Sequence, residues 1–75
     1  MKRVDQLRPG QRGRVAQVQG RGAVRQRLLD LGVLPDTIIE MERVAPAGDP
    51  VWIKLQGFQI SLRVKEAATV VVAVL

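Results

Sequence analysis

A short amphipathic segment that ends at a glycine is the feature that most limits how this chain folds. Residues 25–37 read RQRLLDLGVLPDT. Leu28 and Leu31, with a valine four positions before Leu28, recur at helical spacing, so one face of a helix is predicted to be buried. Gly32 stands where a helix end takes a positive φ, and Pro35 prevents the helix from continuing. The chain therefore carries one short helix within a sequence that otherwise favours strands.

Five stretches are predicted as strands, because apolar residues alternate in the first four and occupy both faces of the last. They are residues 14–19, 37–44, 51–55, 58–62 and 68–75. The alternation in the first is imperfect, which suits a β-bulge. Residues 7–13 and 45–50 contain proline and glycine and are predicted as turns. Residues 63–67 are expected to form a single helical turn.

The clearest hairpin joins residues 51–55 and 58–62 through Gln56 and Gly57. Its alternation predicts one buried face. That face comprises Val51, Ile53, Leu55, Phe58, Ile60 and Leu62. Trp52 projects to the other side, where two interpretations remain open. It packs under the helix or the N-terminal segment, or it stands exposed as a contact anchor, as tryptophan does at binding hot spots.

These elements predict a mainly β fold, and the 75 residues are expected to form a single domain. The expected architecture is a small SH3-like β-barrel, closed or nearly closed, of about five strands with one short α-helix after the first strand. The interior of so small a barrel is filled by its own side chains, so no cofactor cavity is expected. The C-terminal strand, apolar on both faces, needs cover or a partner, and self-association is an open expectation.

Composition argues against catalysis and metal binding. The chain contains no His and no Cys, so the usual general base, thiol nucleophile and zinc ligands are missing. Glu40 and Glu42 share one face of a predicted strand, and such a pair is more often solvated surface than a metal site. We therefore expect no enzyme activity, no cofactor and no metal. The sequence also has no apolar run of membrane-spanning length, which leads us to expect a cytoplasmic protein.

Positive charge is concentrated in the first third of the chain. Residues 1–27 carry eight basic residues and one acidic residue, a net charge of +7, whereas residues 28–75 carry four basic and six acidic residues, a net charge of −2. A nucleic acid, an anionic membrane surface and an acidic protein patch are all compatible with this asymmetry, and so is a simple role in solubility. With only two aromatic residues, a base-stacking surface is disfavoured.

In their order along the chain, several segments resemble the FeoA family, the small ferrous iron transport protein A. The segments are LRPG at 7–10, RQRLLDLGVLPDT at 25–37, APAGDPVWIKLQG at 45–57, ISLRVKEA at 60–67 and the valine-rich end. The residues that carry the signature are Leu28, Leu31, Gly32, Pro35, Gly48, Asp49, Pro50, Leu62, Arg63, Glu66 and Ala67. Asp36 departs from the glycine common in the family. Because Asp tolerates positive φ, the turn should survive.

The resemblance implies a cytosolic SH3-like module that serves the membrane ferrous iron transporter FeoB, at the inner face of the membrane when bound to it. The implied partner is the cytoplasmic region of FeoB, with its G-protein domain or a membrane-proximal part. The residues suggested as partner contacts are Arg21, Arg25, Arg27 and Trp52. FeoA domains also resemble the C-terminal domain of iron-dependent repressors. The alternative is therefore a small basic barrel that binds nucleic acid or serves in an iron-dependent regulator.

Overall fold

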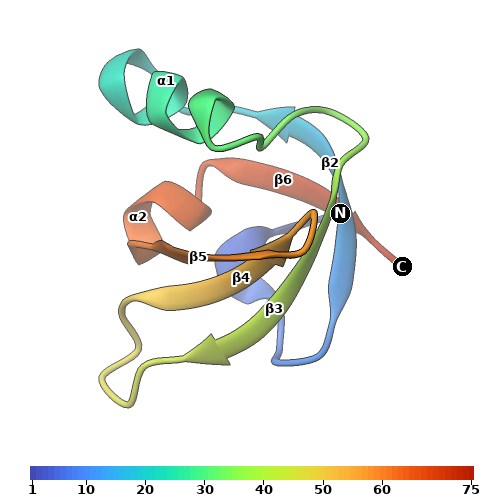
Figure 1. Cartoon of the computed structure of the whole chain (residues 1–75), viewed down its shortest axis with the longest axis vertical. Coiled ribbons are helices and arrows are strands. Elements are labelled where there is room, and N and C mark those ends of the chain that lie inside the picture. Colours follow the sequence, from blue (N-terminus) through green and yellow to red (C-terminus); the bar gives the residue numbers. More distant parts are fainter.

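A computed structural model describes all 75 residues, Met1–Leu75. One antiparallel sheet of six strands runs in the order β1-β6-β2-β3-β4-β5, with two short α-helices and one 3-10 turn (Figure 1). The elements are β1 (Lys2–Arg3), η1 (Val4–Gln6), β2 (Arg12–Val18), α1 (Gly22–Asp30), β3 (Ile38–Val44), β4 (Val51–Leu55), β5 (Phe58–Leu62), α2 (Val64–Ala67) and β6 (Val70–Val74). The predicted mainly β fold with a helix after the first long strand is confirmed.

The sheet curves into an open barrel rather than a closed one. Its two edge strands, β1 and β5, pair with one neighbour each and not with one another. The five predicted strands do not include β1. Its two residues are both basic and show no alternation of apolar and polar side chains. It pairs with β6, matching Lys2 to Val72 and Arg3 to Val71. The predicted self-association through β6 stays a prediction. β2 pairs along one edge of β6, and β1 covers the other edge only at Val71 and Val72.

The core is one cluster of buried apolar side chains drawn from almost every element. Its members are Val4, Leu7, Val15, Val18, Leu28, Val33, Ile39, Met41, Val51, Ile53, Leu55, Leu62, Ala67, Val70 and Val72. Along β4, burial alternates as the pleat requires, with three residues facing inward. Leu28 reaches this cluster from α1 and is fully buried. The helix is therefore attached to the barrel by its apolar face.

Strand β2 contains the bulge that its imperfect alternation suggested. Its register against β6 shifts between Val15 and Gln17. Two residues before Val15, closer to the start of the strand, a side chain on Gly13 would place its Cβ 2.7 Å from Cβ and Cγ2 of Val72. The strands thus approach too closely at that position for any residue but glycine, and the bulge bends β2 around the core.

The end of α1 follows the predicted glycine stop. Gly32 has φ +97°, its N–H donates to the carbonyl of Leu29, and the N–H of Val33 donates to that of Leu28, each at 3.0 Å. This pair of bonds is the Schellman arrangement, and the accompanying apolar contact is supplied by buried Leu28 and Val33. Asp36 has φ +73°, so the aspartate adopts the left-handed conformation that its position requires.

The hairpin of β4 and β5 has the predicted bounds, but one of its inward residues was assigned wrongly. Gln56 and Gly57 both have positive φ, as a two-residue type I′ turn requires. Phe58 is paired with Leu55 next to this turn and is 72% exposed. It lies at the end of an edge strand, where no further strand covers it. Ile60 is half-buried, and the four other predicted residues are buried: Val51, Ile53, Leu55 and Leu62.

Replacing Leu28 with alanine tests whether α1 is held by its apolar face. We expect Leu28→Ala to lower the free energy of unfolding by about 2 to 5 kcal/mol, through lost burial and the cavity left behind. Leu34→Ala is the control, since that side chain is 46% exposed. Urea denaturation measures both variants. A loss below about 0.5 kcal/mol for Leu28→Ala, as for a surface residue, would contradict the packing described.

Candidate partner-binding surface

The first turn of α1 is a positively charged helix end without a side-chain cap. Arg21 is the N-cap residue, with extended backbone (φ −131°), and no side chain accepts a hydrogen bond from the first turn. Before it, Gly20 packs so closely that a Cβ there would lie 3.1 Å from Oγ1 of Thr69. The exposed N–H groups are the positive end of the helix dipole, and Arg21 adds a full charge beside them.

The second arginine predicted as a partner contact is held by the backbone of a neighbouring strand. Nη1 of Arg25 donates to the carbonyl oxygen of Val18, the last residue of β2, at 2.6 Å. The bond spans the loop between β2 and α1. Arg25 thus fixes the direction in which the helix leaves the sheet, while its charge remains at the surface.

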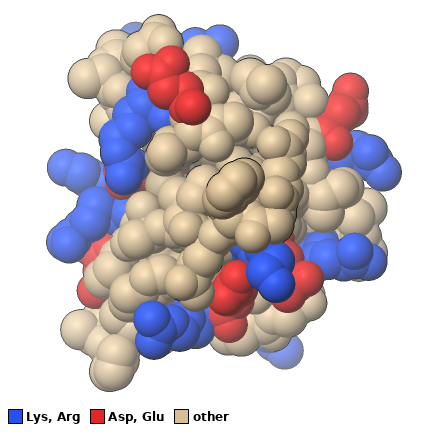
Figure 2. Space-filling model, viewed as in Figure 1, with Lys and Arg blue, Asp and Glu red and all other residues tan.

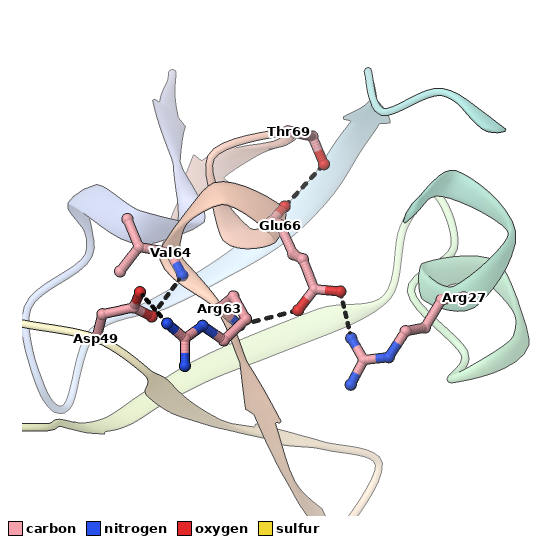
Figure 3. Close-up of polar contacts among 6 residues, drawn as sticks. All are labelled: Arg27, Asp49, Arg63, Val64, Glu66 and Thr69. Atoms are coloured by element: carbon pink, nitrogen blue, oxygen red, sulfur yellow. Dashed lines mark hydrogen bonds and ion pairs between the residues drawn. The ribbon is translucent and has the colours of Figure 1, made fainter. Parts of the chain in front are cut away.

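The third arginine forms an ion pair with the glutamate of the signature segment. Nη1 of Arg27 lies 2.5 Å from Oε2 of Glu66, whose side chain is 9% exposed, against 48% for the arginine (Figure 3). The other carboxylate oxygen of Glu66 accepts the backbone N–H of Arg63 at 2.9 Å and so caps α2. One carboxylate therefore joins α1 to α2 across the molecule.

Asp49 completes the network from the loop before β4. Its Oδ1 accepts the N–H of Val64 at 2.9 Å, and its Oδ2 lies 3.0 Å from Nη2 of Arg63 (Figure 3). The preceding Gly48 has φ +90°, which turns the loop so that the carboxylate points at α2. Four signature residues, Gly48, Asp49, Arg63 and Glu66, thus act together in holding one helical turn.

Trp52 lies on the outer face of β4, apart from this network. It is half-buried, and the guanidinium carbon of Arg43 stands 4.0 Å from its ring centroid, within the range of a cation–π contact. The expectation that Trp52 packs under the helix or the N-terminal segment is not supported by this contact, which comes from β3. Its role as a partner contact stays a prediction. The structure groups the three arginines on or beside α1 and leaves Trp52 on another element.

The surface around these residues has no feature of a small-molecule or metal site. In Figure 2, Lys and Arg side chains lie mainly around the margin of the view, and its centre is largely uncharged. The molecule has no pocket. No three His, Cys, Asp or Glu residues gather into a group that would hold a metal ion. Neither helix has the length and apolar content needed to cross a bilayer. The distinctive feature of this surface is therefore the group of exposed arginines on and beside α1.

The pairing of Arg27 with Glu66 could not be found by sequence reasoning, because the two residues are 39 positions apart. One local signal was available. An arginine followed three positions later by a glutamate, at 63 and 66, matches the spacing of a capping box, although the N-cap is not Ser or Thr. That pattern indicates the cap of α2 but not its connection to α1.

Comparison with known proteins gives the family and the fold. The sequence model of the FeoA domain matches residues 2–74. The fusion protein of Fe(2+) transport protein A and Fe(2+) transporter FeoB from Porphyromonas gingivalis is 32% identical over 68 residues. That match covers 91% of this chain but only 8% of the length of the relative.

Solved structures agree over nearly the whole chain. The FeoA protein of Chlorobium tepidum is 34% identical with a TM-score of 0.90, covering 97% of this chain and 70% of that one. The FeoA of Stenotrophomonas maltophilia, solved with zinc and described as a prokaryotic SH3 domain protein, is 26% identical with a TM-score of 0.86, covering 97% and 91%. The predicted SH3-like fold is thereby confirmed. A manganese-dependent transcriptional repressor, 15% identical with a TM-score of 0.89, covers 99% of this chain and 41% of its own, and shares the fold alone.

The Glu66 network predicts an unequal response to mutation. Glu66→Ala should lower the free energy of unfolding by about 1.5 to 3 kcal/mol, because it removes a charged partner from two donors. Arg27→Gln should cost less, about 1 to 2 kcal/mol, because the carboxylate of Glu66 loses its guanidinium partner but keeps the backbone N–H of Arg63. Lys65→Ala, on the same helical turn but with an exposed side chain, is the control. Chemical denaturation that showed equal, small effects for Glu66→Ala and Lys65→Ala would contradict the network.

Proposed function

This chain belongs to the FeoA family. We therefore propose that it serves ferrous iron transport as a non-catalytic module. In this role it binds the cytoplasmic region of the transporter FeoB. The observation that carries the proposal is the relative in which a segment 32% identical to this chain lies in one polypeptide with FeoB. Covalent fusion keeps two proteins together, and separate chains with the same task need a binding surface instead. The proposed location is cytoplasmic, at the membrane when FeoB is bound.

The proposed effect on FeoB is to promote its assembly or its nucleotide cycle. The Stenotrophomonas maltophilia FeoA has been proposed as a bacterial ferrous iron transport activating factor. A rigid barrel of this kind acts through the surface it presents, so its influence on FeoB would come from the geometry of docking. Nucleic-acid binding is favoured only by positive charge and by the fold shared with the repressors, and we do not propose it.

The start of α1 is the surface that we propose for docking. Of the three arginine side chains there, that of Arg25 is hydrogen-bonded to Val18 and that of Arg27 is paired with Glu66. The side chain of Arg21 is exposed and makes no hydrogen bond or ion pair. Arg21 also lies at the positive end of the helix dipole. An acidic patch on FeoB would meet a free guanidinium there, backed by two arginines whose positions are already fixed.

Charge reversal at Arg21 tests this surface without disturbing the fold. We expect Arg21→Glu to weaken binding of the purified cytoplasmic region of FeoB by about fivefold or more, and to reduce the salt dependence of the affinity, because a favourable charge contact becomes repulsive. Isothermal titration calorimetry at two salt concentrations measures both. Lys54→Glu changes the net charge equally, on the outer face of β4, and serves as the control. An Arg21→Glu affinity equal to that of wild type would remove the start of α1 from the interface.

A further inference from the structure

The outer faces of β1, β6 and β2 form one continuous surface on the opposite side of the sheet from the core. The register aligns Arg3 with Val71 and Val71 with Gln17 in one row, and Arg14 with Ala73 in the next. Pairing of β2 with the C-terminal end continues one residue further, where the N–H of Leu75 donates to the carbonyl of Arg12 at 2.9 Å. We call this surface, made by Arg3, Arg12, Arg14, Gln17, Val71, Ala73 and Leu75, the β1–β6–β2 face.

The β1–β6–β2 face has an apolar middle and a basic margin. Val71 and Ala73 are partly exposed along β6, and Leu75 is 59% exposed. Arg12 and Arg14 flank them from β2, are exposed, and have no ion pair or side-chain hydrogen bond. Arg3, on the other flank, is half-exposed and pairs with Asp5 at 3.2 Å. Arg14 stands opposite Ile38 of β3, and Arg12 stands opposite Glu40 without forming an ion pair with it. Neither guanidinium group beside the apolar strip is therefore held in an ion pair.

The outer face of the other half of the sheet differs in charge. Glu40 on β3 stands opposite Lys54 on β4, and Glu42 accepts a hydrogen bond from the side chain of Gln59. Arg43 there is placed over Trp52. Acidic and basic groups therefore alternate on that side, and Glu40 marks its border because it is also opposite Arg12 of β2. Within the β1–β6–β2 face itself the charged residues are all arginines.

We propose that the β1–β6–β2 face binds the surface of a bilayer that contains anionic phospholipid. Arg12 and Arg14 would bond lipid phosphates, for which the planar guanidinium is well suited, while Val71, Ala73 and Leu75 lie against the headgroup region. A duplex nucleic acid would place phosphates along the apolar strip, where no cation meets them, and a single strand would need aromatic residues for stacking, which this face lacks. The charge pattern therefore favours a lipid surface.

The inference does not rest on FeoB binding, and the two are separable by experiment. The surface proposed for FeoB is the start of α1, and the lipid face is formed by strands. Binding to protein-free vesicles involves no transporter, so a negative result there leaves the FeoB proposal standing. A positive result adds a way for the chain to be held at the membrane while α1 engages its partner.

Vesicle sedimentation tests the proposal directly. Sucrose-loaded vesicles of phosphatidylcholine with phosphatidylglycerol should pellet the wild-type protein at low salt, and vesicles of phosphatidylcholine alone should not. The double variant R12Q/R14Q should lower the partition coefficient by about 25-fold, from roughly fivefold for each basic residue at an anionic surface. The matched control K54Q/K65Q removes the same net charge from other surfaces and should stay within about twofold of wild type.

Two results would overturn the proposal. One is an equal loss of binding in R12Q/R14Q and K54Q/K65Q, which would mean that net charge alone determines adhesion. The other is wild-type binding to a DNA duplex at the same salt concentration with no binding to the anionic vesicles. Circular dichroism spectra of the variants establish that both are folded before either result is interpreted. A charge-preserving change in the apolar strip, Leu75→Gln, should also weaken vesicle binding, by about threefold or more.

Discussion

The arrangement of the two helices depends on the contacts of the Glu66 carboxylate with Arg27 of α1 and with the backbone N–H of Arg63. A charged side chain that is 9% exposed is tolerated only when hydrogen-bonded and paired, and Glu66 has both a backbone N–H and a guanidinium as partners. The backbone carbonyl of the same residue accepts the hydroxyl of Thr69 at 2.7 Å, just before β6 begins. One residue therefore fixes α2, the start of the last strand and the position of α1.

This constraint changes how the basic residues of the chain are understood. A net charge of +7 in the first 27 residues suggests a single binding patch, but the structure divides the arginines by task. Arg25 and Arg27 hold α1 on the barrel, whereas the side chain of Arg21 at its start has no hydrogen-bond or ion-pair partner within the chain. Arg12 and Arg14 lie on the strands instead. The arginine side chains without a partner in the fold therefore lie on two separate surfaces, one at the start of α1 and one on β2.

The sequence was most informative where local patterns determine local structure. Alternation and a two-residue turn gave the bounds of β4 and β5, and Gly32 gave the end of α1. The exposure of Phe58 was missed because alternation gives the face of a strand but not whether the sheet extends over it. The short β1 has no pattern of its own and exists only because β6 offers an edge.

The candidate site was less predictable than the fold, because its contacts join residues distant in sequence. Charge and resemblance selected Arg21, Arg25 and Arg27 together, and only the structure shows that two of them are engaged. The signature residues Asp49 and Glu66 are recognisable in the sequence as part of a motif, but the sequence does not show what they contact. In the structure both carboxylates accept hydrogen bonds from backbone N–H groups at the start of α2. This part of the signature therefore stabilises the fold and is not a reactive site.

We propose that the start of α1 binds FeoB, whereas the Glu66 network stabilises the fold. An NMR titration of the ¹⁵N-labelled chain with the cytoplasmic region of FeoB tests it most directly, because every amide reports at once. We expect the largest chemical-shift changes at residues 20–25 and only small changes at Asp49 and Glu66. Shifts confined to the outer face of β3, β4 and β5, around Trp52, would contradict it.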